Sequence, residues 1–106
     1  MIYTVQEIQS RVMPVAQKYG IKAVFLFGSY AKGTATEDSD IDLLIDTSGT
    51  ALRSLLSLGA LYNDLEAVLE KKIDLITIRS LEQRTQMPSE AAFREAVMKE
   101  RVRLYD

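Results

Sequence analysis

The chain has 106 residues, of which 47% are hydrophobic and 26% charged, an ordinary composition for one globular domain with a single core. Its formal net charge of −2 argues against a general nucleic-acid binder, which would carry a basic patch, so we expect no direct nucleic-acid binding. It contains no cysteine and no histidine. Disulfides, thiolate metal sites, Ser-His or Cys-His catalysis and nearly every zinc site are therefore excluded, and any catalysis must use carboxylates, hydroxyls, Lys or Arg, with a hard cation that prefers oxygen.

The first predicted element is an amphipathic helix over residues 4–19. Thr4 and Glu7 resemble a capping box at its start, and Gly20 suits the position after its end. Pro14 lies inside the pattern, where it would kink or split the helix. Because charges recur every few residues in this segment, it is neither a signal peptide nor a membrane span. We therefore expect a cytoplasmic location and no membrane partner.

The later elements alternate between strands and helices. In chain order the sequence predicts a buried strand over 21–28, a Gly-, Ser- and Thr-rich loop over 28–39, a strand over 40–46, a long helix from 51 to about 71, a strand over 72–78, a short helix or turn, and a last helix from Pro88 to about Leu104. This order indicates an α/β (α+β) fold with a small mixed sheet flanked by helices, which we assign as one domain over residues 1–106.

Two of these helices carry surfaces that need an interpretation. The helix over 51–71 is mostly core, although its apolar side is broad enough to include a partner surface. On the last helix, basic residues alternate with acidic ones, which we interpret as an ordinary charged face; the basic residues are Arg94, Lys99, Arg101 and Arg103.

The segment from Phe27 to Asp46, FGSYAKGTATEDSDIDLLID, holds the candidate chemistry. Gly28 and Gly33 have the spacing of a P-loop, but Thr34 follows where a P-loop requires lysine, so this interpretation fails. An EF-hand calcium loop fails as well. Its sixth position is Leu43 instead of glycine, and its twelfth is a glycine instead of glutamate.

A two-metal phosphoryl-transfer site fits this segment better. In a strand, Asp40 and Asp42 point to the same face, with Cα atoms about 6.5–7 Å apart. Two carboxylates that close raise each other's pKa unless a cation stands between them, and Mg²⁺ leaves positions open for substrate phosphates. If the strand over 72–78 is a neighbour, Asp74 faces the same place. The three acids would then hold two metals, with Asp74 as the base that deprotonates an attacking hydroxyl.

The turn before these acids would bind phosphates. Gly28 has no Cβ and lets a nucleotide triphosphate approach the main chain, and Ser29 adds a hydroxyl and a main-chain N–H. Lys32 would supply a positive charge there, unless it is a solvated surface residue. Ser39 is a further candidate for phosphate binding, and for this residue a turn-shaping hydrogen bond stays open as the alternative.

These residues resemble a known signature. Gly28-Ser29, ten intervening residues and Asp40-x-Asp42 are similar to the motif of the DNA polymerase β-like nucleotidyltransferase superfamily, and more closely to that of the minimal nucleotidyltransferases (MNT proteins). The positions typical of the MNT motif are Gly28, Ser29, Ala31, Gly33, Ser39, Asp40, Asp42 and Leu43. The resemblance covers about residues 1–100. Asp74 is the position that matches the family's third metal carboxylate.

The resemblance implies an activity and a partner. The expected reaction transfers AMP from ATP to a hydroxyl, with Mg²⁺ and release of pyrophosphate. Many minimal members pair with a HEPN-domain toxin encoded next to them and resemble antitoxins that adenylylate a tyrosine of that partner. The larger relatives have a second domain for which this chain leaves no room, so we expect the partner to supply much of the acceptor site. The alternatives are a binding module that masks its partner without catalysis, and an enzyme that modifies a small molecule.

Overall fold

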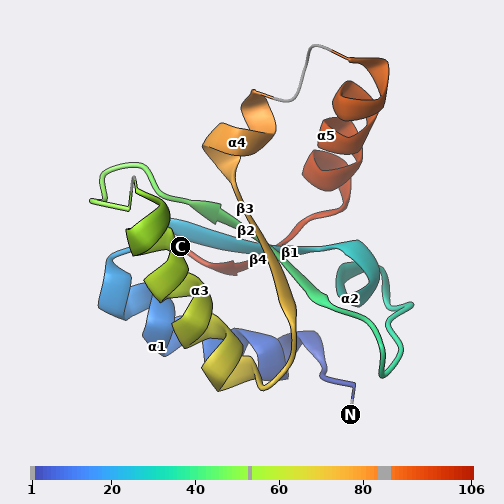
Figure 1. The fold of residues 1–106 in the computed structure, drawn as a ribbon. Helices are drawn as coiled ribbons and strands as arrows, with labels where there is room; N and C mark the ends of the chain where they lie inside the picture. Colours follow the sequence, from blue (N-terminus) through green and yellow to red (C-terminus); the bar gives the residue numbers. More distant parts are fainter. Residues whose placement is uncertain (1, 53, 84–86) are drawn as a thin grey trace.

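A computed structural model describes residues 2–52, 54–83 and 87–106 (Figure 1). The elements in chain order are α1 (Val5–Tyr19), β1 (Ala23–Phe27), α2 (Gly28–Lys32), β2 (Ile41–Asp46), α3 (Leu55–Leu69), β3 (Ile73–Thr77), α4 (Ile78–Glu82), α5 (Pro88–Glu100) and β4 (Val102–Tyr105). The sheet has the order β3-β2-β1-β4. β1 is antiparallel to β2 and β4, whereas β2 and β3 are parallel, so the predicted mixed sheet is confirmed.

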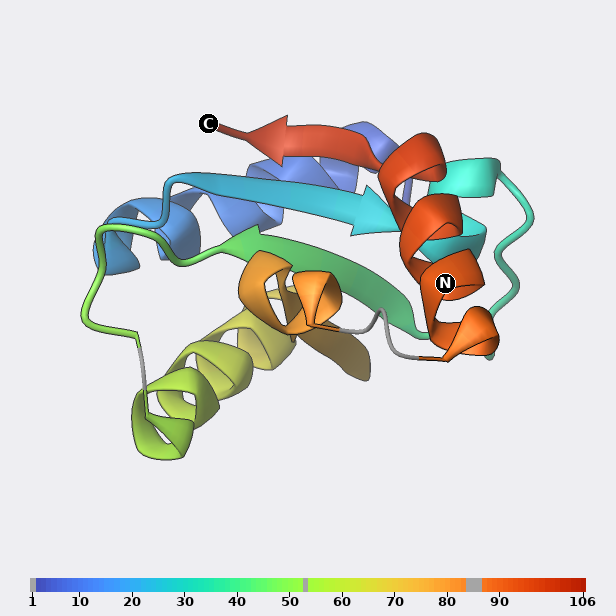
Figure 2. The same ribbon diagram turned by 90° about the horizontal axis from the view of Figure 1, so that it is seen from above.

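Helices cover both faces of this sheet (Figures 1 and 2). α1 and α3 pack on one face, where Ile41, Leu43 and Ile45 of β2 join the main core. On the other face, Leu44 belongs to a smaller apolar cluster with residues of β1, α4 and α5. Since successive strand residues point to opposite faces, Asp42 lies on the face of this smaller cluster. Asp42 therefore lies on the side of the sheet opposite the main core.

The first helix forms as its sequence predicts. Thr4 Oγ1 accepts a hydrogen bond from the Glu7 main-chain N–H at 3.1 Å, and Glu7 Oε1 accepts one from the Thr4 N–H at 2.9 Å, which completes the capping box. Gly20 closes the helix in the left-handed conformation, with φ of 65°. Pro14 lies within the continuous helix α1, so it does not split the element.

Two predicted boundaries are wrong. The loop predicted over 28–39 begins with the short helix α2, whose end is capped by Gly33 at φ 77°. The long helix starts at Leu55, after the N-cap Ser54, whose hydroxyl accepts a hydrogen bond from the Ser57 N–H. Ala51, Leu52 and Ser54, which were predicted to belong to this helix, therefore precede it, and residue 53 of the same prediction lies outside the described residues. Leu55 and Leu56 in its first turn are 90% and 87% exposed, so they belong to its surface and not to its core.

The last predicted helix is wrong at its C-terminal end. α5 stops at Glu100, and the chain returns as β4, which pairs with the free edge of β1. Leu104 is buried, and the guanidinium carbons of Arg101 and Arg103 lie 4.2 and 5.1 Å from the centroid of the Phe25 ring. These two arginines therefore pack on the sheet and do not belong to an ordinary charged helix face.

Within the described ranges, no helix combines the length and the apolar character that crossing a bilayer requires.

Candidate active site

The end of β1 brings the main chain against a carboxylate. Phe27, the last residue of β1, pairs with Asp42 of β2, and Gly28 follows at φ 72°. A Cβ at Gly28 would overlap Asp42 Oδ2 and would lie 3.0 Å from Asp42 Cγ. Only glycine fits here, both because of the positive φ and because the main chain touches the Asp42 side chain. The predicted Gly-Ser turn and the predicted acids thus form one site.

The parallel pairing of β2 and β3 adds the third acid. Asp42 and Asp74 are register partners, and the neighbouring strands of a sheet lie about 4.8 Å apart. Asp40 immediately precedes β2, two residues from Asp42. The predicted adjacency of Asp74 to Asp42 is therefore present in the structure, although Asp40 lies just outside the strand in which it was predicted.

The charge of this group is poorly compensated. Partial burial raises the pKa of the Asp42 carboxyl to about 6, with further contributions from the negative charges of Asp74 and Asp40. A carboxyl in this position loses its proton at a higher pH than an ordinary aspartate, and a cation beside it would lower this pKa. A bound metal ion would reduce the repulsion among these carboxylates, so the electrostatics indicates a candidate metal site.

The donor set fits magnesium, but it is incomplete by itself. Mg²⁺ prefers oxygen ligands and is commonly held by one or two carboxylates together with substrate phosphates and water. In the part of the chain that the structure describes, no three acidic side chains gather closely enough to form a complete metal site. Asp42 with Asp40 or Asp74 could supply the protein ligands, and the substrate would have to supply the others.

The other predicted phosphate ligands are Ser29, Lys32 and Ser39, and each has a different environment. Ser29 is half-buried in the first turn of α2. Lys32 Nζ lies 3.3 Å from Glu100 Oε2, an ion pair that links α2 to the end of α5. Ser39 Oγ accepts a hydrogen bond from the Thr36 N–H at 2.8 Å, which is the turn-shaping alternative. Phosphate binding by these three residues stays a prediction.

Tyr62 of α3 is a neighbour of the acids that the sequence did not reveal. Its hydroxyl donates a hydrogen bond of 3.3 Å to the carbonyl oxygen of Ile73, the residue before Asp74. Burial raises the pKa of Tyr62, and so do Glu66 and, more weakly, Asp40 and Asp74. No local sequence pattern connects an α3 tyrosine with these acids, since only the folded chain brings them together.

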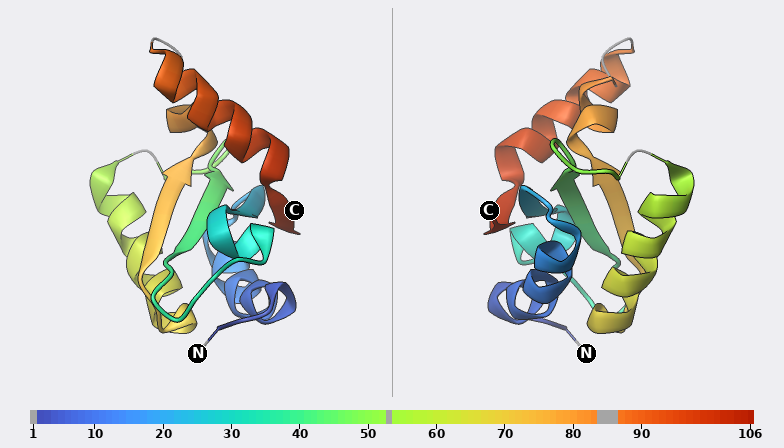
Figure 3. Two further views of the ribbon diagram at one scale, coloured as in Figure 1. Left: turned by 90° about the vertical axis from the view of Figure 1, so that its right-hand side faces the viewer. Right: turned by 90° about the vertical axis from the view of Figure 1, so that its left-hand side faces the viewer.

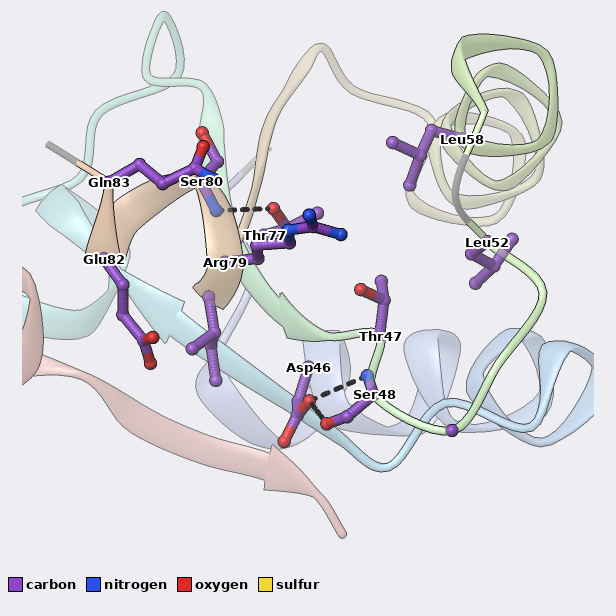
Figure 4. Close-up of a pocket in the computed structure, with 12 residues that line it drawn as sticks. Asp46, Thr47, Ser48, Leu52, Leu58, Thr77, Arg79, Ser80, Glu82 and Gln83 are labelled. Atoms are coloured by element: carbon purple, nitrogen blue, oxygen red, sulfur yellow. Dashed lines mark hydrogen bonds between the residues drawn. The ribbon is translucent and has the colours of Figure 1, made fainter.

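A pocket of about 750 Å³ lies at the opposite ends of β2 and β3 (Figure 4). It is bordered by the turn after β2, where Asp46 accepts hydrogen bonds from the N–H and the hydroxyl of Ser48. On its other side Thr77 Oγ1 accepts the Ser80 N–H at 3.0 Å. None of the predicted site residues borders this pocket, so it is not where the predicted chemistry lies.

Comparison with known proteins identifies the class to which this fold and site belong. The sequence profile of the nucleotidyltransferase domain matches residues 14–104. The chain therefore belongs to the nucleotidyltransferase domain family, and it is a nucleotidyltransferase by class. It is 37% identical over 82 residues to the protein adenylyltransferase MntA of Thermococcus cleftensis, covering 74% of this chain and 81% of that one. It is also 39% identical over 77 residues to a Methanocaldococcus jannaschii protein assigned as a protein adenylyltransferase, covering 73% and 81% of the two chains.

Solved structures agree with this fold. A protein assigned to the minimal nucleotidyltransferases is similar, with a TM-score of 0.68, 31% identity, and coverage of 94% of this chain and 95% of that one. A toxin-antitoxin structure with AMP-PNP is similar at a TM-score of 0.69 and 20% identity, over 92% of this chain and 72% of that one. An MNT antitoxin in complex with the tri-AMPylated HEPN toxin of Shewanella oneidensis is similar at a TM-score of 0.64 and 17% identity, over 96% and 72%. At these lower identities the likeness concerns the fold.

Proposed function

We propose that this chain is a Mg²⁺-dependent protein adenylyltransferase that transfers AMP from ATP to a tyrosine hydroxyl of a HEPN-type toxin, and that it thereby acts as an antitoxin. The observation that carries the proposal is the contact between the Gly28 main chain and the carboxylate of Asp42, which is itself the register partner of Asp74. A phosphate-binding turn and a carboxylate pair in direct contact are what nucleotidyl transfer requires.

Each of the predicted site residues has its own role in this reaction. The turn at Gly28 and Ser29 holds the outer phosphates and orients the α-phosphorus, because its main chain can be approached closely. Asp40 and Asp42, with Asp74, would hold Mg²⁺, which would neutralise phosphate charge and polarise the phosphoryl oxygens. Asp74 accepts the proton of the attacking hydroxyl. The new bond joins the tyrosine oxygen to the α-phosphorus, the bond to the bridging oxygen breaks, and pyrophosphate leaves with that oxygen.

Two properties of the known relatives support a protein as the acceptor. MntA of Thermococcus cleftensis is named a protein adenylyltransferase, and the similar MNT antitoxin forms a complex with an AMPylated HEPN toxin. In this chain, Leu55 and Leu56 expose adjacent apolar side chains at the start of α3. A surface of that kind suits contact with another protein better than it suits contact with water.

The test is transfer of label from ATP labelled in its α-phosphate to the HEPN-type protein encoded next to this chain. We expect label on the partner with Mg²⁺ present, no transfer when the label is in the γ-phosphate, and no transfer from Asp40→Ala or Asp42→Ala. Mutation of the labelled tyrosine to Phe should remove the signal. If both aspartate variants label the partner as well as the wild type, the proposed mechanism is wrong.

A binding module that masks its toxin without catalysis remains the second candidate, and the exposed leucine pair of α3 is the observation that favours it. The double variant Asp40→Ala/Asp42→Ala distinguishes the two. Masking predicts that this variant still neutralises the toxin in cells, with no modification on the partner by mass spectrometry. Catalysis predicts that neutralisation is lost although the two proteins still form a complex.

A further inference from the structure

A hollow of about 620 Å³ lies where the start of β1, the end of β2 and strand β4 meet, and we call it the basic hollow. Its border includes three cations, Lys22, Arg101 and Arg103, and two carboxylates, Asp46 and Asp106. Figure 3 shows how the chain runs from α5 directly into β4, which brings the two arginines to this edge of the sheet. The basic hollow thus carries more positive than negative side chains, although the chain as a whole has a net charge of −2.

The two arginines of the basic hollow share one aromatic ring. The guanidinium carbon of Arg101 lies 4.2 Å from the centroid of the Phe25 ring, and that of Arg103 lies 5.1 Å from it. Phe25 is only 4% exposed, so its ring is a fixed support for both side chains. A guanidinium that stacks on a ring keeps the N–H groups at its edge for carboxylates, which it binds in a planar fork. The stacking therefore positions both cations without using their hydrogen-bond donors.

The carboxylates of the basic hollow do not neutralise all of its cations. Asp106 Oδ2 accepts a hydrogen bond from Arg103 Nη1 at 2.8 Å, so these two charges form a pair. The Asp46 carboxylate accepts two hydrogen bonds within the turn after β2. In the part of the chain that the structure describes, neither Arg101 nor Lys22 makes an ion pair or a side-chain hydrogen bond. Lys22 is exposed and Arg101 is partly exposed, so an anion from outside the chain can reach both.

The basic hollow lies on the same face of the sheet as Asp42, at the other end of β1. Phe25 and Phe27 both belong to the apolar cluster of that face, and Phe27 pairs with Asp42. Ala23, which borders the hollow, is four residues before Phe27, a distance of about 13 Å along a strand. A protein–protein interface of ordinary size covers a patch about 30 Å across. A protein that brings its hydroxyl to the carboxylates therefore also reaches the basic hollow.

A second hollow adjoins the first. The pocket of about 750 Å³ in Figure 4 shares Asp46 and Ile78 with the basic hollow, and its border also includes Leu52 and Leu58 beside the start of α3. The exposed leucine pair of α3 stands in the first turn of that helix. The two hollows together form an extended surface that is basic at β4 and apolar towards α3.

We infer that the basic hollow is a docking site for an acidic segment of the partner protein, whose carboxylates bind Arg101 and Lys22. The inference rests on the proposed function, in which the partner is the HEPN-type toxin. A protein segment fits better than a nucleic acid, because the Phe25 ring is buried beneath the arginines and offers no face on which bases can stack. The net charge of −2 also disfavours a long polyanion.

The test measures the complex and the reaction separately, with the variants Lys22→Glu and Arg101→Gln. The dissociation constant of the complex with the toxin is determined by calorimetry at about 50 mM and about 500 mM NaCl. KM for the toxin and kcat are determined from the transfer of α-phosphate label. Lys99→Glu is the matched control, because Lys99 is an exposed cation that borders neither hollow. Thermal denaturation checks each fold, and the exposed Lys22 provides a test that leaves the stacking on Phe25 intact.

At the lower salt concentration we expect both variants to bind the toxin about 5- to 50-fold more weakly than the wild type. This difference should largely disappear at the higher salt concentration, because salt screens the attraction between exposed charges. KM for the toxin should rise by a similar factor while kcat stays within about twofold, since the basic hollow is remote from the reacting atoms. Lys99→Glu should stay within about twofold of the wild type in every measurement.

Three results would overturn the inference. If the wild type binds and labels the toxin and both variants keep its KM, the basic hollow is not a docking site. The same holds if both variants bind the toxin normally but lose affinity for a labelled single-stranded RNA of about 20 nucleotides, which would make the hollow an RNA site. If the wild type neither binds nor labels the toxin, the proposed function itself fails and this inference fails with it.

Discussion

At the scale of single residues, Asp42 carries a conflict between stability and activity. Its folded-state pKa of about 6 lies above the ordinary value of 3.8, so this group favours the folded state most below pH 4. That contribution is lost as the pH rises from about 4 to about 6, and above this range the ionised carboxylate destabilises the fold by about 1–3 kcal/mol. A charge maintained at such a cost is typical of a functional site.

The variant Asp42→Asn separates the two effects. At pH 7 we expect it to unfold with a free energy about 1–3 kcal/mol higher than the wild type, and at pH 4 we expect the difference to vanish. Urea denaturation at the two pH values measures this. Asp38→Asn, in the exposed loop before the site, is the control and should stay within about 0.5 kcal/mol of the wild type at both. A variant that is equally destabilised at both pH values would contradict the electrostatic explanation.

Gly28 is the second residue at which a small change has a large expected effect. Gly28→Ala places a methyl group both in the left-handed region and against the Asp42 carboxylate, so we expect a loss of about 2–5 kcal/mol of stability and loss of nucleotide binding. Gly33→Ala has a similar φ of 77° but no atom within 4 Å of the added Cβ. It should cost only about 1–2 kcal/mol. Equal losses in denaturation experiments would show that the contact with Asp42 is unimportant.

At the scale of elements, helix α3 has two parts with different roles. Leu61 is fully buried against the sheet, whereas Leu55 and Leu56 in the first turn are exposed. Leu61→Ala should therefore lower the free energy of unfolding by about 2–5 kcal/mol. The double variant Leu55→Ser/Leu56→Ser should change it by less than about 0.5 kcal/mol and should weaken the complex with the partner toxin. A double variant that unfolds the chain, or that binds the toxin like the wild type, would contradict this division.

The elements also show where sequence patterns are informative. The capping box at Thr4 and Glu7 and the glycine at position 20 are local signals, and they predicted both ends of α1. Strand β4 was missed because its four residues follow α5 with a single intervening residue and continue the charge alternation of that helix. What makes these residues a strand is the open edge of β1, which only the assembled sheet provides.

At the scale of the whole molecule, the site combines a local and a non-local part. Gly28, Ser29, Asp40 and Asp42 stand within one short segment, so their spacing alone predicted the turn and the acids. The position of Asp74 beside Asp42 depends on α3, which returns the chain so that β3 pairs in parallel with β2. The sequence could suggest this connection but could not prove it. The partial burial of Arg94, whose Nε is buried, could not be predicted from the sequence, since the charge pattern of α5 is that of an exposed helix face.

The most direct test of the reaction centre compares Asp74→Asn with Asp38→Asn in the transfer of α-phosphate label to the partner. Both variants remove one carboxylate, but only Asp74 is the register partner of Asp42. If Asp74 is a catalytic base and metal ligand, Asp74→Asn should lower the rate of label transfer at least about 10²-fold, while Asp38→Asn should stay within about threefold of the wild type. If Asp74→Asn transfers label as fast as Asp38→Asn, the three-carboxylate centre is contradicted.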